Sequence, residues 1–166
     1  MSDRSSRAGS WIAALTIAVS LAPAANVAAA EPVKLRFDPR TTLKVVARRM
    51  DITLRPEIPL PEIRLASATP LGRIQDAVEG PWGARPERIA NAFVSNTNEI
   101  YLIDDASYYA GVGRTIDDSL AHELAHYLQT RYGRANLVDW EEVEAVAIQN
   151  WFRTEHVQEK LVAAGR

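Results

Sequence analysis

The stretch SLAHELAHYLQ, residues 119–129, decides both the fold class and the chemistry that we expect of this chain. It contains His122 and His126, two of the three histidines in the chain, with Glu123 directly after the first. Four residues advance an α-helix by about 40° beyond one turn, so both imidazoles lie on one face and can converge on one metal ion. Glu123 points to the side of that ion. The pattern is typical of zinc sites in which the glutamate takes a proton from zinc-activated water.

Local signals predict that the motif lies on a helix over residues 115–132, ended by Gly133. Thr115 and Asp118 have a spacing close to that of a capping box, and acidic residues at this end suit the helix dipole. Apolar residues fall on one side of the helix. Polar residues fall on the other side: Ser119, His122, His126, Gln129 and Thr130. A solvated helix face can carry two histidines by chance, but the cap and the separated faces favour a metal site.

The third metal ligand is less clear from the pattern. A catalytic zinc ion needs three protein ligands and one open position. The metzincin spacing would place a third histidine where this chain has Tyr132, and His156 lies far along the next predicted helix, residues 139–162. A carboxylate is therefore the better candidate. Glu142 falls in a polar sector of that helix, whereas Glu144 falls in an apolar sector, where a glutamate usually has a partner.

The residues HELAHYLQ, followed at a short distance by EVEA at 142–145, resemble the gluzincin branch of the zincin metallopeptidases. The likeness is greatest to its small single-domain members, the minigluzincins, and covers roughly residues 98–152. It implies that His122, His126 and Glu142 bind one Zn²⁺ ion and that Glu123 is the general base. On this resemblance we prefer Glu142 as the third ligand, with Glu144 as the alternative.

One position departs from the family pattern. Many of these enzymes have an aspartate four residues after the ligand glutamate, and it supports a zinc-bound histidine. Val146 occupies that position here. The group that orients the histidines must therefore come from elsewhere, and Asp117, Asp118 or a backbone carbonyl are the candidates.

The resemblance also predicts where a peptide substrate binds. In zincins an edge strand just before the metal helix binds the peptide by β-addition. The stretch NEIYLID, residues 98–104, occupies the matching place, so Ile100, Tyr101 and Leu102 are expected to bind substrate. A tyrosine or histidine usually stabilises the oxyanion in this branch. The candidates, among which spacing does not select, are Tyr108, Tyr109 and His156.

The first thirty residues differ from the rest of the chain. Arg4 and Arg7 precede an uncharged apolar run at 11–21, and small residues follow up to Ala30. This order is typical of a secretory signal peptide cleaved near Ala30, with a retained membrane anchor as the alternative. We therefore expect an exported protein, periplasmic or secreted. The chain has no cysteine, which excludes disulfides and a cysteine-linked lipid.

Residues 31–166 are expected to form one α+β domain. The composition, 47% hydrophobic and 24% charged, is that of a globular protein, and the formal net charge of −2 offers no footprint for nucleic acid. Besides the two helices above, the pattern predicts strands at 33–39 and 62–67, a hairpin from 89–94 and 100–103, helices at 41–51 and 70–80, and a loop at 106–115. The expected fold is a small zincin-like domain with a short antiparallel or mixed sheet.

The function expected from these features is that of an exported zinc-dependent metallopeptidase acting on a peptide or protein substrate, with no membrane attachment after cleavage of the leader. Two rivals remain at this stage. One is a non-catalytic zincin-like binding or assembly module of the cell envelope. The other is a metal-dependent amidase that acts on cell-wall peptides.

Overall fold

The computed structural model describes residues 32–83, 85–87, 91–133 and 138–158. The predicted signal peptide, residues 1–30, and the end of the helix predicted over 139–162 lie outside these ranges. Within them, no helix combines the length and the apolar character needed to cross a bilayer.

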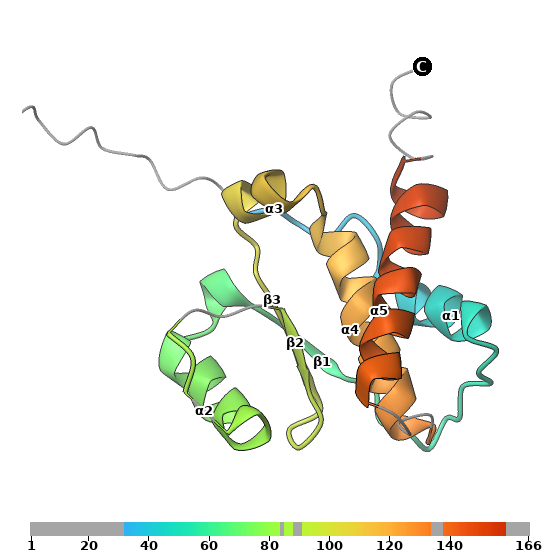
Figure 1. Ribbon diagram of the computed structural model, residues 1–166, viewed down its shortest axis with the longest axis horizontal. Coiled ribbons are helices and arrows are strands. Elements are labelled where there is room, and N and C mark those ends of the chain that lie inside the picture. Colours follow the sequence, from blue (N-terminus) through green and yellow to red (C-terminus); the bar gives the residue numbers. More distant parts are fainter. Residues whose placement is uncertain (1–31, 84, 88–90, 134–137, 159–166) are drawn as a thin grey trace, which may run out of the picture.

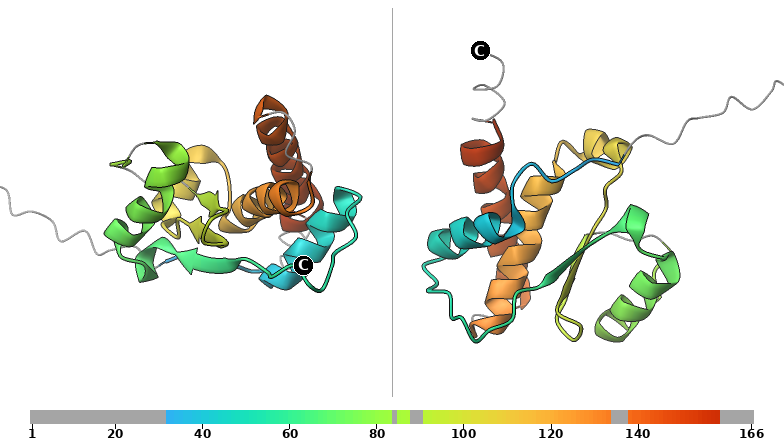
Figure 2. Two further views of the ribbon diagram at one scale, coloured as in Figure 1. Left: turned by 90° about the horizontal axis from the view of Figure 1, so that it is seen from below. Right: turned by 180° about the vertical axis from the view of Figure 1, so that it is seen from behind.

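A small three-stranded sheet lies between helices on both of its faces (Figure 1). The strand order is β1 (Glu62–Leu65), β3 (Glu99–Leu102), β2 (Ala92–Val94), with β1 parallel and β2 antiparallel to β3. Helix α2 (Leu71–Trp82) lies on one side of the sheet, and α4 (Ile116–Arg131) packs on the other with α1 (Pro39–Arg49) and α5 (Val138–Phe152) (Figure 2). The predicted α+β class and mixed sheet are confirmed.

The two faces of the sheet belong to two apolar clusters, because side chains alternate along a strand. Ile100 and Leu102 face the larger core, which they share with α1, α4 and α5. Tyr101 faces the smaller cluster, with Ile74 and Val78 of α2. Burial on both faces makes β3 the most enclosed strand of the sheet, since all four of its residues are buried.

Several predicted elements are confirmed with shifted ends. The hairpin is β2 and β3, and the strand predicted at 62–67 is the edge strand β1. Helix α1 begins at Pro39 rather than Thr41, because the Asp38 carboxylate accepts a hydrogen bond from the Thr41 N–H and acts as the N-cap. Helix α2 continues past Gly80 to Trp82, where Gly83 takes the left-handed C-cap conformation, with φ of +68°.

Two predictions about the chain before α4 are wrong. Residues 33–38 form no strand, because the N–H groups of Arg36 and Phe37 donate to the Asp117 carboxylate at 2.8 and 3.1 Å instead of to a neighbouring strand. The loop predicted at 106–115 contains helix α3 (Ala106–Val112). Asp105 caps this helix by accepting a hydrogen bond from the Ser107 N–H. An aspartate at this position indicates a helix start, but the two glycines nearby led us to predict a loop.

Helix α4 begins with the predicted capping box. Thr115 Oγ1 accepts from the Asp118 N–H at 3.2 Å, and Asp118 Oδ2 accepts from the Thr115 N–H at 3.0 Å. The side predicted to be polar is covered by other elements, because Ser119 and Gln129 are each only 1% exposed. Helix α5 is the main cover of α4 and runs on as a π-helical segment over Arg153–Gln158.

Glu99 is a buried carboxylate of β3, and its ionisation makes the stability of the fold depend on pH. It accepts hydrogen bonds from Tyr101 Oη at 2.6 Å, Arg73 Nη2 at 2.7 Å and Arg64 Nε at 3.1 Å. Burial alone would raise the pKa of Glu99, but these donors outweigh it and lower the pKa to about 2 from 4.5. The ionised group therefore stabilises the fold above about pH 4.5 and loses this contribution as the pH falls towards 2.

We expect Glu99→Gln to remove this dependence. The free energy of unfolding, measured by denaturant titration at a series of pH values, should fall less steeply for the variant than for the wild type between about pH 4.5 and 2. Equal slopes in that range would contradict the assignment, whatever the difference in stability at neutral pH.

Candidate metal centre

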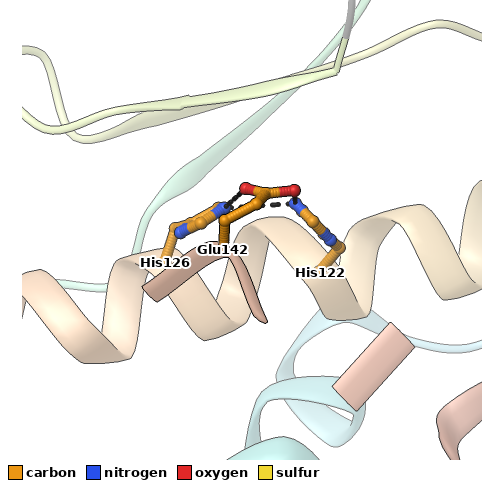
Figure 3. A group of neighbouring side chains, drawn as sticks. All are labelled: His122, His126 and Glu142. Atoms are coloured by element: carbon orange, nitrogen blue, oxygen red, sulfur yellow. Dashed lines mark hydrogen bonds and ion pairs between the residues drawn. The ribbon is translucent and has the colours of Figure 1, made fainter. Parts of the chain in front are cut away.

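Two imidazoles from α4 and one carboxylate from α5 converge on a common point (Figure 3). His122 Nε2 and His126 Nε2 lie 3.1 Å apart. The Glu142 carboxylate bridges them, with Oε1 3.6 Å from His122 Nε2 and Oε2 3.2 Å from His126 Nε2. One ligand atom from each residue lies within 4.8 Å of the others, so this group can hold a metal ion.

The position of Glu142 depends on contacts that fix α5 against α4. Asp118, fully buried on α4, accepts hydrogen bonds from Gln149 Nε2 and Arg153 Nε, both at 2.9 Å. These two donors lie two and three helical turns after Glu142. The same aspartate that caps α4 therefore also sets the register of the helix that carries the third member of the metal group.

Gln129 orients one of the two histidines. Its amide nitrogen donates to the Glu141 carbonyl at 2.8 Å and to Glu144 Oε2 at 3.1 Å. The amide oxygen is thereby turned towards His126 Nδ1, 2.9 Å away, and must accept a hydrogen bond from its N–H. The proton of a neutral His126 then lies on Nδ1, which leaves the Nε2 lone pair free to bind a metal ion.

None of the orienting groups that we predicted is found among the described residues: the two aspartates have other partners, and no backbone carbonyl accepts a hydrogen bond from His122 Nδ1. Asp117 binds Arg36 and Phe37 of the segment before α1, and Asp118 joins the helix cap to α5. Neither has a hydrogen bond with a histidine among the described residues. The sequence did contain a signal for Gln129, because it lies three residues after His126 on the same side of the helix, but we did not consider it as the orienting group.

The two glutamates that are candidates for the third ligand have different partners. Glu142 is 62% exposed in its side chain and faces both histidines. Glu144 instead accepts the hydrogen bond from Gln129 and is not part of the group. The expectation that a glutamate in an apolar sector has a partner is correct, but the partner found here is an amide.

Glu123 lies beside the metal group and is 5% exposed. Its Oε2 accepts a hydrogen bond from the Phe93 N–H of β2 at 2.8 Å. Burial raises the pKa of Glu123 to about 8, against the effect of that hydrogen bond, and the charge of Glu142 adds to the rise. A carboxyl group with a pKa near neutrality is suited to take up and return a proton.

His122 is held in the neutral form that metal ions require. Burial lowers the pKa of its imidazole to about 4, with a further contribution from the charge of His126. The pKa therefore lies well below neutral pH, so no proton competes with a metal ion for the ring there.

The metal group and Glu123 line one cleft of about 480 Å³ between α4 and β2. The remaining walls come from Tyr108 on α3, Arg114 before α4, and Gln149 on α5. Helix α3 and β2 close the side of the cleft that faces away from α5. The cleft is the one place in the described residues where the predicted ligands and the predicted base open onto the same space.

The predicted substrate strand is wrong. Ile100, Tyr101 and Leu102 lie in β3, which is the middle strand of the sheet and is paired on both sides, so it cannot accept a further strand. All three side chains are buried. The edge strand that lines the cleft is β2, whose Phe93 N–H is directed at Glu123 and away from β3.

Of the three candidates for stabilising an oxyanion, Tyr108 alone lines the cleft. The hydroxyl of Tyr109 donates to the Ile103 carbonyl and is thereby occupied. His156 packs against Trp151 and Phe152 in the core behind α4.

Comparison of the chain with family models, curated proteins and solved structures finds no match. The resemblance to gluzincins therefore stays a prediction from the motif. What the site can do has to be argued from its own geometry.

Proposed function

We propose that this chain is an exported zinc-dependent metallopeptidase that hydrolyses peptide bonds with Glu123 as its general base. The observation that carries the proposal is the position of Glu123. It lies in the cleft that also holds His122, His126 and Glu142, and its pKa is raised towards neutrality. A site that only held a metal for structural reasons would have no use for a buried base at its side.

The donor atoms fit a zinc ion in number and spacing. Zinc–nitrogen and zinc–oxygen distances of about 2.0–2.1 Å place tetrahedral ligand atoms roughly 3.3–3.4 Å apart. Here the two imidazole nitrogens lie 3.1 Å apart, and a single Glu142 oxygen lies within 4.8 Å of both, so a small movement of the exposed Glu142 side chain would bring the three atoms to that spacing. Three protein ligands with one open position are typical of a catalytic zinc site, whereas structural sites have four.

The residues divide the work of hydrolysis among them. Zinc, when bound, acts as a Lewis acid and makes water more acidic. Glu123 takes up a proton on its carboxylate, which the Phe93 N–H holds in place, and later returns it to the leaving amine. Tyr108 is placed to donate a hydrogen bond to the substrate carbonyl oxygen as negative charge develops there.

The shape of the cleft supports an extended peptide as the substrate. Strand β2 is only three residues long and is an edge strand along the cleft, where its Phe93 N–H is donated to Glu123 and the carbonyl of Ser95, just after it, accepts from Arg131. An extended peptide that adds to this edge competes with Glu123 for the Phe93 N–H or pairs with the remaining backbone groups, which would hold it in one register regardless of side chains. The scissile bond of such a peptide would lie between β2 and the metal group.

The proposal is tested by metal content and peptide digestion together. We expect the purified protein to contain about one zinc ion per chain and to cleave peptides from a mixed library, analysed by mass spectrometry. A chelator should abolish cleavage, and one equivalent of zinc should restore it. Cleavage that survives chelation would contradict the proposal.

The same experiment separates the two rivals. Zinc and peptide binding without any cleavage would indicate a non-catalytic binding module. Cleavage confined to cross-linked cell-wall peptides, with linear protein peptides intact, would indicate an amidase.

A further inference from the structure

Arg114 is an exposed cation at one end of the cleft. It precedes the Thr115 cap of α4 and follows Gly113, whose φ of +62° ends α3, so its backbone is fixed from both sides. Its guanidinium has no hydrogen bond or ion pair with any residue of the described ranges. Arg114 lines the same cleft as the metal group and Glu123.

The direction of β2 shows which part of a bound peptide would reach Arg114. The first end of β2 lies by α3, because Asn91 Oδ1 accepts from the Ile103 N–H at 2.7 Å and lies 3.5 Å from Tyr109 Oη. The other end lies by the last turn of α4, because the Ser95 carbonyl accepts from Arg131 at 2.8 Å. Strand β2 therefore runs alongside α4 in the same direction.

A peptide that pairs antiparallel to β2 runs the opposite way, and antiparallel pairs are the more stable kind. Its N-terminal part lies by Ser95, the reacting bond by Glu123, and its C-terminal part by Tyr108 and Arg114. In the parallel direction, the free amino group of a short peptide would meet the guanidinium and be repelled.

The distance between Arg114 and His122 determines which residue of a bound peptide the guanidinium would contact. Arg114 precedes His122 by eight residues, which is about 12 Å along a helix axis. An extended peptide covers about 3.3 Å per residue, and the length of the arginine side chain shortens the gap. The guanidinium would therefore meet the second or third residue after the scissile bond.

The charges in the cleft favour an acidic group at this point. Near the metal group the cleft carries the exposed carboxylate of Glu142, which would repel a substrate carboxylate. Beyond Arg114, a neighbouring pocket of about 270 Å³ adds Lys34, which also lacks an ion pair among the described residues, and Arg36, which is bound to Asp117. A planar guanidinium binds a carboxylate through two parallel hydrogen bonds.

We infer that Arg114 selects peptides that carry a carboxylate two or three residues after the bond to be cleaved. The inference rests on the proposed peptidase function. The carboxylate has two possible sources: the free C-terminus of a peptide cleaved near its end, or an aspartate or glutamate side chain within a longer peptide.

The test uses one peptide sequence, taken from the library digest, in four forms. The first ends in a free acid two residues after the scissile bond, and the second is its C-terminal amide. The third and fourth are longer peptides with glutamate or glutamine at that position. We expect kcat/KM to be about 10-fold or more higher for the acid than for the amide, or for glutamate than for glutamine, and the pair that shows the difference identifies the source.

In the variant Arg114→Gln, the ratio of kcat/KM for the acidic peptide to kcat/KM for the neutral peptide should be close to one. The control Arg40→Gln changes an exposed arginine of α1 outside the cleft and should keep the wild-type ratio. An acid preference that survives Arg114→Gln would overturn the inference, as would equal cleavage of all four peptides. A preference for acidic residues before the scissile bond would also overturn it.

Binding of the same peptides to the zinc-loaded Glu123→Gln variant, measured by calorimetry, gives a second readout that needs no turnover. The charged form should bind about 10-fold or more tightly than the neutral form, and the additional change Arg114→Gln should remove the difference. If cleavage of these peptides survives the chelator but this difference is found, the zinc-peptidase proposal fails while the role of Arg114 in binding stands. Equal binding of the two forms overturns the inference by itself.

Discussion

Replacement of Glu123 by glutamine is expected to lower the rate of peptide hydrolysis by about 10²–10⁴-fold, the usual contribution of a general base. The substitution keeps the shape of the side chain, and its amide oxygen can still accept the hydrogen bond from the Phe93 N–H. What it removes is the ability to take up a proton. Zinc content should stay at the wild-type level, because Glu123 is not in the group of His122, His126 and Glu142.

The same variant should be more stable than the wild type when both are metal-free. The pKa of Glu123 is about 8 in the folded chain against 4.5 for a free glutamate, so the folded state holds a proton that the unfolded state releases. As the pH rises between these two pKa values, the free energy of unfolding falls by about 1.4 kcal/mol per pH unit, or on the order of 3 kcal/mol by pH 7. Glutamine carries no such cost.

Both effects can be measured with one matched control. Hydrolysis is followed on a peptide from the library digest, and thermal unfolding of the metal-free proteins is compared at pH values from about 5 to 8. Glu155→Gln, which changes an exposed carboxylate in the π-helical segment after α5, should alter neither. A Glu123→Gln protein that is inactive and also less stable at every pH would indicate a structural role for this residue.

The parts of the site that depend on local sequence could be predicted. The cap of α4, the shared face of His122 and His126, and the position of Glu123 beside them all follow from helix geometry over a few residues. The hairpin of β2 and β3 was also visible, because a short turn forces neighbouring runs to pair.

The errors arise where distant segments meet. The alternation of Val33, Leu35 and Phe37 indicated a strand, and these side chains do pack partly buried on the core. Their backbone, however, is bound by Asp117, which is some 80 residues away. Periodicity shows which side chains are buried, but not which groups form hydrogen bonds with the backbone between them.

The order of the strands is a second error of this kind. The hairpin fixes β2 next to β3, but β1 can pair with either of them after the chain has crossed over through α2. It pairs with β3, which places β3 in the centre and leaves β2 at the cleft. The substrate edge was therefore assigned to the wrong strand of a correctly predicted hairpin.

The choice between Glu142 and Glu144 leads to the second large effect. Both lie on α5, two residues apart, and helix periodicity alone favoured Glu144. Glu144 can lie in apolar surroundings because it accepts a hydrogen bond from Gln129. The same glutamine directs His126 towards the metal group. Glu142 is exposed, and its carboxylate oxygens lie 3.6 and 3.2 Å from the two imidazoles, in a group that could hold a metal ion.

We therefore expect Glu142→Gln to lower zinc affinity by about 100-fold or more. Removing a group that only hydrogen-bonds to a metal ligand already lowers metal affinity by about 10–100-fold. Glu144→Gln is the matched control and should lower the affinity by about 10-fold or less, because it acts only through Gln129 and the orientation of His126. Competition with a chromophoric chelator gives both affinities. Circular dichroism should show both variants folded, since Glu142 is 62% exposed and Glu144 keeps a polar side chain. Loss of zinc from Glu144→Gln with retention in Glu142→Gln would assign the third ligand to Glu144, as helix periodicity alone had suggested.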